Sequence, residues 1–139
     1  RMEVYPSRDG RVVAIVDYAH NKMSFEALLR SVRTEYPGKK IIMVFGSAGG
    51  KAFSRRPDLG EAAGKYADYT VLTEEDPGEE PFANTAADIG RYIAANGGSY
   101  SDTRCDKQSR GQQGRAYPRQ GQGDKGKARD CICRNAFRR

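Results

Sequence analysis

The sequence predicts an α/β domain with a doubly wound, mostly parallel sheet that is truncated and followed by a disordered basic tail. Over residues 11–100, short apolar runs alternate with helical stripes of apolar residues, and short connections join them. Charge is divided unevenly, since residues 1–100 carry 13 basic and 14 acidic side chains, whereas residues 101–139 carry 11 and 4. In that last segment, apolar residues are too sparse and unpatterned to build a core. We therefore expect a linker at 1–10, the domain at 11–100 and a low-order tail at 101–139.

The first strand is predicted at residues 11–16, where a nearly continuous apolar run is typical of a parallel strand covered on both faces. A helix follows it, because apolar side chains recur at intervals of three and four residues, at Phe25, Leu28, Leu29, Val32 and Tyr36. The Pro-Gly pair at 37–38 ends this helix.

The same order of strand and helix is predicted twice more. Residues 40–45 form the second apolar run, and Leu59, Ala62, Ala63 and Tyr66 mark a helix whose first turn accommodates Pro57. Residues 69–73 form the third run, and a helix with Phe82, Ile89, Tyr92 and Ile93 ends at the glycine pair 97–98. Ligands of such sheets bind at the carboxyl ends of the strands, so the loops 17–24, 46–56 and 74–81 are the candidate sites.

The first of these loops places three polar side chains just before a helix. Asp17, His20 and Asn21 follow the first strand, where the unsatisfied N–H groups of a helix N-terminus favour an anion such as phosphate. An equally weighted interpretation is that Asp17 and Asn21 only cap the helix and that His20 is a packed surface imidazole.

The second loop is rich in glycine and contains Lys51, Arg55 and Arg56, which could bind a phosphate or a carboxylate. It lacks the Gly-Lys-Ser/Thr ending of a P-loop and the spacing of a dinucleotide fingerprint. Composition alone favours a plainer interpretation, a turn with a solvated basic face.

The third loop concentrates five carboxylates between Thr73 and Pro81. It would suit a cationic ligand, although an acidic, solvated turn is the simpler interpretation. Basic and acidic loops on one rim of a sheet would fit a site that handles both phosphate and an amine.

Four motifs, read together, resemble the C-terminal domain of the Mur ligases, a Rossmann-like domain. They are Val-Asp-Tyr-Ala-His-Asn at 16–21, Phe-Gly-Ser-Ala-Gly at 45–49, Arg-Arg-Pro-Asp-Leu-Gly at 55–60 and Thr-Glu-Glu-Asp-Pro at 73–77. The resemblance is greatest to the tripeptide synthetase (MurE-type) branch, which adds the third residue to a peptidoglycan precursor. Cyanophycin and folylpolyglutamate synthetases share the first motif, so another amide ligase of this kind is the alternative.

The resemblance implies an ATP-dependent ligase of peptidoglycan synthesis, and hence of cell wall biogenesis, cell shape and cell division. ATP phosphorylates the carboxylate of UDP-N-acetylmuramoyl-dipeptide, and the amine of a free amino acid attacks the acyl phosphate. Asp17, His20 and Asn21 would approach the ATP. ATP and Mg²⁺ would be bound mainly by a central domain that is missing here, together with the N-terminal domain, so the fragment alone should not catalyse.

The resemblance also points to the residues that bind the incoming amino acid. Lys51 stands where the family commonly has an arginine that grips this substrate, with Arg55 and Arg56 close behind. Asp76, Pro77 and Gly78 stand where diaminopimelate-adding members have Asn-Pro-Arg, so the arginine for a second carboxylate is replaced by glycine. We therefore expect L-lysine or ornithine, with the side-chain ammonium near Asp76.

The composition also indicates where the protein acts. No apolar run approaches the ~20 residues that cross a bilayer, and the first residues lack the apolar core of a signal peptide. We expect a cytoplasmic protein without a membrane partner. Because no initiator Met precedes Arg1, we also expect the chain to be part of a longer one.

Three hypotheses concern the tail. Its sequence is compatible with translation from a shifted reading frame, in which the end of the chain would resemble the missing end of the family domain. Its net charge of +7 could bind nucleic acid nonspecifically, which would make the chain a noncatalytic module with a basic tail. Cys131 and Cys133 could bind metal, but with Cys105 remote and the single His at position 20 we expect no metal site. Nucleic acid is likewise not an expected partner.

Overall fold

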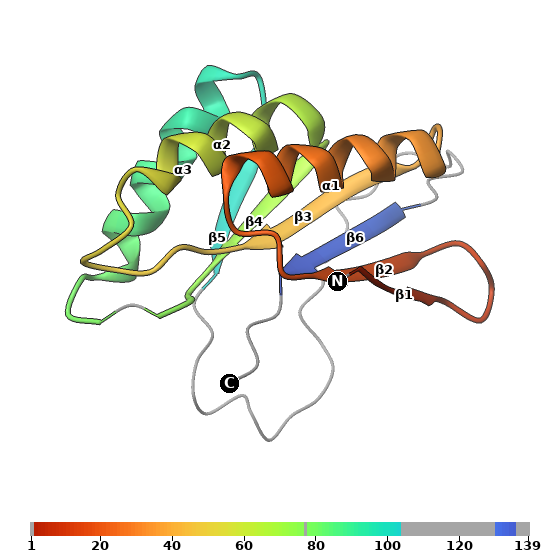
Figure 1. The fold of residues 1–139 in the computed structure, drawn as a ribbon, viewed down its shortest axis with the longest axis horizontal. Helices are drawn as coiled ribbons and strands as arrows, with labels where there is room; N and C mark the ends of the chain where they lie inside the picture. The colour runs from red at the N-terminus through yellow and green to blue at the C-terminus, as the bar shows by residue number, and fades with distance from the viewer. Residues whose placement is uncertain (1, 77, 104–129, 136–139) are drawn as a thin grey trace, which may run out of the picture.

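The computed structural model describes residues 2–76, 78–103 and 130–135. Three helices lie side by side over one face of a six-stranded sheet (Figure 1). The elements in chain order are β1 (Glu3–Pro6), β2 (Val13–Asp17), α1 (Lys22–Glu35), β3 (Lys40–Phe45), α2 (Arg55–Tyr66), β4 (Tyr69–Thr73), α3 (Phe82–Ala95), β5 (Tyr100–Thr103) and β6 (Asp130–Asn135).

The strand order is β1-β2-β6-β3-β4-β5. Only β1 runs antiparallel to its neighbour, so the predicted fold class, a mostly parallel α/β sheet, is confirmed. The connections through α1, α2 and α3 all step in one direction along the sheet. Because crossovers between parallel strands are right-handed, this common direction puts the three helices on the same face.

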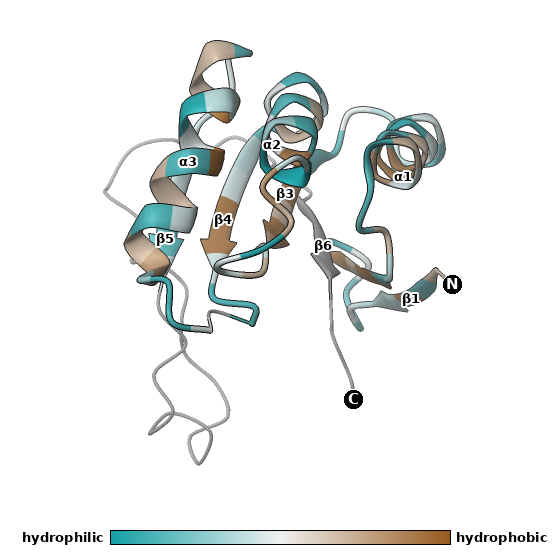
Figure 2. Ribbon diagram, turned by 60° about the vertical axis from the view of Figure 1, so that its left-hand side comes forward, coloured by the Kyte–Doolittle hydropathy of each residue, from teal (hydrophilic) through white to brown (hydrophobic). Residues whose placement is uncertain are grey.

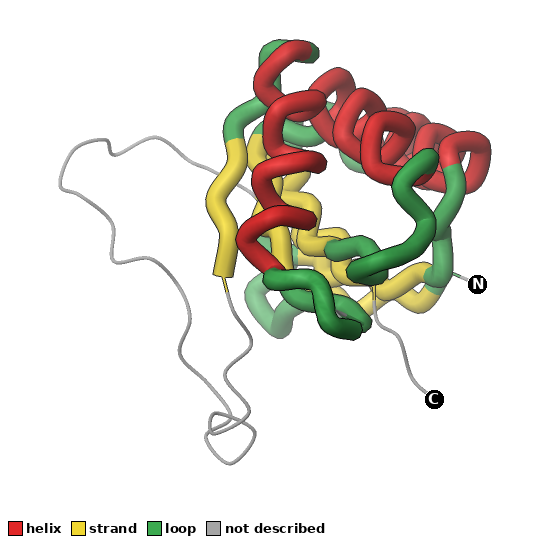
Figure 3. Tube along the Cα trace, turned by 90° about the vertical axis from the view of Figure 1, so that its left-hand side faces the viewer, coloured by secondary structure: helices red, strands yellow, loops and turns green. Residues whose placement is uncertain are grey.

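The prediction that the strands are covered on both faces differs from the structure. Within the described residues, helices cover one face only (Figure 3). Along β2 and β3 the side chains under the helices are buried, namely Val13, Ile15, Ile41, Met43 and Phe45, while the alternate residues Ala14, Val16, Ile42 and Val44 are half-buried. An apolar run by itself does not reveal this difference between the two faces.

The core lies between the helices and the sheet. Figure 2 shows hydrophobic and hydrophilic residues alternating along the helices, with hydrophobic residues beneath them in β3 and in the second half of β4. Phe25 of α1 packs edge-on against Phe45 at the end of β3, with ring centroids 5.0 Å apart. Helix α2 packs closely on α3 because Gly60 has no side chain; a β-carbon there would lie 2.7 Å from that of Tyr92.

The sheet extends beyond the domain that the sequence predicts at residues 11–100. The predicted linker contains β1, and the predicted tail begins within β5 and contains β6, which pairs with β2 and β3. The predicted low-order tail thus includes two segments, residues 101–103 and 130–135, that the structure places in strands. Both edge strands are short and mostly exposed, so no apolar alternation marks them. The predictions for residues 104–129 and 136–139, and for Cys105, lie outside the described residues.

None of the helices in the described ranges is long and apolar enough to cross a membrane.

Candidate functional site

The three candidate loops follow the carboxyl ends of β2, β3 and β4; β3 and β4 are neighbours in the sheet, whereas β6 lies between β2 and β3. We call residues 46–54, after β3, the glycine loop and residues 74–81, after β4, the acidic loop. Their backbones are joined by a hydrogen bond from the Gly49 N–H to the Asp76 carbonyl, at 2.8 Å. The loop after β2 leads into α1, whose first residue, Lys22, contacts Asp58 of α2 through its Nζ at 3.3 Å, so this loop lies at the same end of the sheet.

The loop after β2 is held by local hydrogen bonds. Asp17 Oδ1 accepts from the Ala19 N–H at 2.7 Å, and His20 Nδ1 lies 2.9 Å from the Tyr18 carbonyl oxygen. Because a carbonyl only accepts, Nδ1 must carry a proton, and in the neutral ring Nε2 is then the acceptor. The structure therefore orients His20 with a defined tautomer.

Asn21 begins α1 as its N-cap. Its Oδ1 accepts from the Ser24 N–H at 3.0 Å, and Ser24 Oγ accepts from the Asn21 N–H at 3.3 Å, a reciprocal capping box. The structure thus assigns Asn21 the capping role that the sequence left open.

Lys51 and Asp76 form an ion pair across the two loops. Lys51 Nζ lies 2.9 Å from Asp76 Oδ2, and the side chains are 64% and 56% exposed. Arg55 is also exposed. An exposed pair contributes little to stability, so both charged groups can exchange partners at small cost.

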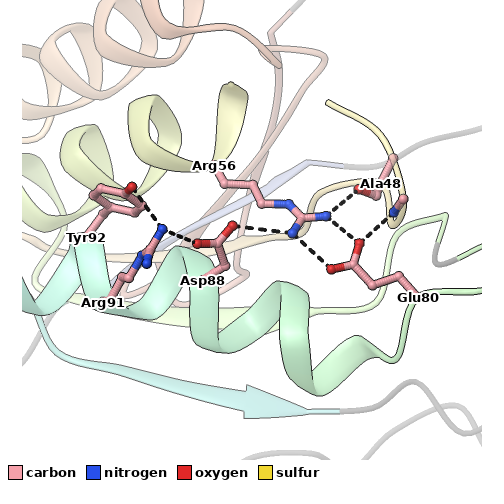
Figure 4. Close-up of polar contacts among 7 residues, drawn as sticks. Ala48, Arg56, Glu80, Asp88, Arg91 and Tyr92 are labelled. Carbon is pink, nitrogen blue, oxygen red and sulfur yellow. Dashed lines mark hydrogen bonds and ion pairs between the residues drawn. The ribbon is translucent and has the colours of Figure 1, made fainter. Parts of the chain in front are cut away.

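Arg56 does not present its charge to solvent. Its side chain is 2% exposed, and its two terminal nitrogens bind both carboxylate oxygens of Glu80 at 3.0 and 2.6 Å (Figure 4). They also contact Asp88 and the Ala48 carbonyl oxygen, both at 3.3 Å. The Arg56–Glu80 hydrogen bonds raise the pKa of Arg56. The expectation that Arg56 binds substrate directly therefore does not fit its position, which is internal.

In the acidic loop the carboxylate of Asp76 is exposed and that of Glu75 is half-buried. Gly78 is exposed and has a φ of 57°, a left-handed conformation that favours glycine. Pro77 lies outside the described residues. Sequence reasoning missed Glu75, whose pKa is raised chiefly by burial and against the attraction of Arg55. The sequence contains a feature that could have identified Glu75: it directly precedes Asp76, just after a buried strand.

The close approach of the two loops depends on Gly46. A β-carbon at this position would overlap the carbonyl oxygen of Thr73 at the end of β4. Across the joined loops, cations at Lys51 and Arg55 face carboxylates at Glu75 and Asp76. Such a rim can bind a molecule that carries both an anion and an amine. In the described ranges, no group of three or more His, Cys, Asp or Glu side chains could hold a metal ion.

Comparison with known families gives one matching domain model, described as Mur ligase, glutamate ligase domain, which covers residues 1–109. Among curated proteins, the UDP-N-acetylmuramoyl-L-alanyl-D-glutamate–L-lysine ligase of Enterococcus faecalis is 43% identical over 93 residues. The UDP-N-acetylmuramyl-tripeptide synthetase of Lactobacillus acidophilus is also 43% identical over 93 residues. Each alignment covers 67% of this chain and 18% of the relative, so the chain spans less than a fifth of their length.

A further relative, from Alkalilimnicola ehrlichii, is named as a 2,6-diaminopimelate ligase and is 42% identical over 80 residues, 58% of this chain and 16% of that protein. Among solved structures, a ligase of that same name aligns over 97% of this chain and 25% of its own, with a TM-score of 0.69 and 22% identity. Folylpolyglutamate synthase from Thermotoga maritima aligns over 98% of this chain and 27% of its own, with a TM-score of 0.57 and 14% identity. At these identities the two structures show a shared fold.

Proposed function

The chain belongs to the Mur ligase family, as its glutamate ligase domain, and on this premise we propose that it is the C-terminal part of an ATP-dependent amide ligase. The parent enzyme adds the third amino acid to UDP-N-acetylmuramoyl-dipeptide. The observation that carries the proposal is the junction of the glycine loop and the acidic loop, where Lys51 and Asp76 lie 2.9 Å apart, at the carboxyl ends of β3 and β4. The names of relatives at 43% identity support the same reaction.

In this reaction a carboxylate oxygen of the dipeptide attacks the γ-phosphorus of ATP, and ADP leaves. The amine of the amino acid then attacks the acyl carbon, phosphate leaves, and the amine loses a proton. The described residues would provide one wall of the cleft. His20 and the N-terminus of α1 suit the phosphate side, since that end of a helix favours anions. Mg²⁺ would be held, with most of the ATP, by the central domain.

The rim would bind the amino acid. Lys51, with Arg55 nearby, would take its carboxylate, and Asp76 with Glu75 would take its side-chain ammonium. Among curated relatives, both lysine and diaminopimelate ligases occur near 43% identity, so identity alone does not choose the substrate. Gly78 offers no cation for a second carboxylate, which favours L-lysine or ornithine over diaminopimelate.

The parent enzyme would act in the cytoplasm, where ATP and the nucleotide-linked precursor are found. Through the precursor it would contribute to cell wall biogenesis, and so to cell shape and division. Its partners would be UDP-N-acetylmuramoyl-dipeptide, the free amino acid and its own N-terminal and central domains. By itself, the 139-residue chain should lack ligase activity.

The proposal is tested with the full-length ligase in a competition assay. The enzyme receives UDP-N-acetylmuramoyl-dipeptide, ATP and equal concentrations of L-lysine, ornithine and diaminopimelate, and the products are separated by mass. We expect lysyl or ornithyl product to dominate. Dominance of diaminopimelate would refute the substrate assignment, and absence of any ATP-dependent product would refute the ligase function.

A further inference from the structure

We propose that Arg56 is a positioning residue that holds the glycine loop and the acidic loop at the spacing needed to bind the incoming amino acid. It acts from the interior, through Glu80, on the exposed pair Lys51 and Asp76. The effect on amino-acid binding rests on the proposed function, whereas the joining of the loops does not.

One guanidinium group links three separate segments. Arg56 donates to Ala48 of the glycine loop, to Glu80 of the acidic loop and to Asp88 of α3, as Figure 4 shows. Glu80 Oε2 accepts in addition from the Gly50 N–H, at 2.5 Å. Glu80 is thus bound both by the buried cation and by the backbone of the glycine loop.

This link is strong because of where it lies. A cation that is 2% exposed is stable only when it is paired, and Arg56 faces two carboxylates. Charge-assisted, bidentate bonds of this kind fix direction as well as distance. A lysine at the same position would keep the charge but could not form the fork.

The exposed pair cannot hold the loops by itself. Lys51 and Asp76 are both more than half exposed, and such pairs are weak and screened by salt. Lys51 directly follows Gly50, whose N–H donates to Glu80, and the Asp76 carbonyl accepts from Gly49, which follows Ala48, so both charges lie beside backbone that contacts the Arg56–Glu80 link. When an amino acid replaces the direct contact and pairs with both charges, the two loops must stay at a fixed spacing, and a shift of about 1 Å can be costly for catalysis.

The loop after β2 is held independently. His20 and Asn21 are fixed by contacts within their own loop and with Ser24. Loss of the Arg56 link should therefore change the KM for the amino acid and leave the KM for ATP unchanged.

Arg33 provides a control at the amino ends of the strands, opposite the carboxyl ends that carry the candidate loops. It lies near the end of α1, and its guanidinium donates to the carbonyl oxygens of Tyr66 and Lys39 and to Asp68, at 2.6–3.1 Å. Those partners precede β3 and β4, far along the strands from the loops. Arg33→Met thus removes a guanidinium that also has three partner groups, in a more exposed setting of 36% against 2%, without touching the candidate site.

The first test measures amide hydrogen exchange in the 139-residue chain for Arg56→Met and Arg33→Met. We expect the Gly49 and Gly50 amides to exchange about tenfold faster or more in Arg56→Met, and to keep their wild-type rates in Arg33→Met. If Arg56→Met does not fold, Glu80→Gln removes the charge of the partner with little change of shape. Wild-type exchange at both glycines in a folded variant would overturn the inference.

The second test measures steady-state kinetics of the full-length ligase at a temperature where all variants are folded. Arg56→Met should raise the KM for the amino acid about tenfold or more, with the KM for ATP within about twofold of wild type, and Arg56→Lys should lie between. Equal effects of Arg33→Met, or an unchanged amino-acid KM in Arg56→Met, would overturn the positioning role. A wild-type enzyme that forms no amide at all would refute the proposed function, while the exchange result would still decide whether Arg56 joins the loops.

Discussion

The phenol ring of Tyr100 lies directly over Gly90, where any β-carbon would overlap its ring atoms. Gly90 is in the middle of α3, and Tyr100 begins the edge strand β5. The absence of a side chain in the helix therefore sets how closely β5 can approach it. Within a helix, glycine is otherwise unfavourable, so this contact compensates for a poor helix former.

We predict that Gly90→Ala destabilises the chain by up to about 2 kcal/mol, because the added methyl group displaces the Tyr100 ring at a cost of about 1–3 kcal/mol, against a gain of about 1 kcal/mol for alanine over glycine in a helix. Urea unfolding would measure the change in free energy. The double variant Gly90→Ala/Tyr100→Ala should be more stable than the sum of the two single variants predicts, since the ring that clashes is gone. Strict additivity would show that the overlap is relieved in another way.

Ala52 has a φ of 57°, the single non-glycine residue with a positive φ in the described ranges. This conformation costs an L-residue about 1–2 kcal/mol. We predict that Ala52→Gly stabilises the chain by about 0.5–1 kcal/mol, after the larger entropy of the unfolded glycine is subtracted. Ala27→Gly, at an exposed position in α1, should instead destabilise by about 1 kcal/mol. The two substitutions are chemically identical, so changes in the free energy of unfolding with the same sign would contradict the prediction.

Ionisation of Glu75 should contribute unfavourably to the free energy of folding at neutral pH, and this contribution should be absent in acid. Burial raises its pKa, so its ionised form is disfavoured in the folded state. The penalty is absent below the ordinary pKa of Glu, about 4.3, and complete above the raised pKa. We predict that Glu75→Gln stabilises the chain near pH 7 and has little effect near pH 3, as measured by urea unfolding at both values.

Glu80→Gln is the matched control, because the pKa of Glu80 is shifted the other way. Hydrogen bonds from Arg56, and next from the Gly50 N–H, lower it. The ionised form therefore stabilises the fold above the ordinary pKa of Glu, and this contribution is lost as the pH falls through the lowered pKa. Glu80→Gln should thus destabilise at neutral pH and lose its effect in acid. If both variants changed the free energy of unfolding at neutral pH in the same direction, burial of Glu75 and pairing of Glu80 would not be the causes of their pKa shifts.

Asp76 should affect the use of a diamino acid by the full-length ligase. Asp76→Asn removes the charge that would bind the side-chain ammonium, and we predict that the KM for L-lysine rises about tenfold. Glu79→Gln removes a charge from another exposed position of the same loop and should leave the KM nearly unchanged. A similar rise in both variants would indicate a general effect of the loop charge rather than a specific contact.

Much of the site could be predicted from the sequence because its parts are local. The ends of buried strands are marked by composition, and parallel strands place those ends on one edge. Lys51 and Asp76 were therefore expected on the same rim before their contact was known. Arg56 was misjudged because burial of a cation depends on carboxylates that are 24 and 32 residues away in the chain.

The sequence by itself determined the parallel α/β class, the order of the three helices between the strands and the loops that carry charge. These features follow from apolar periodicity, caps and breakers, which act over a few residues. Only the tertiary structure decided the burial of Arg56, the half-buried state of Glu75 and the addition of β1, β5 and β6 to the sheet. The reason is physical: strand pairing, desolvation and ion pairing depend on groups far apart in the chain, and the pattern of one segment does not contain them.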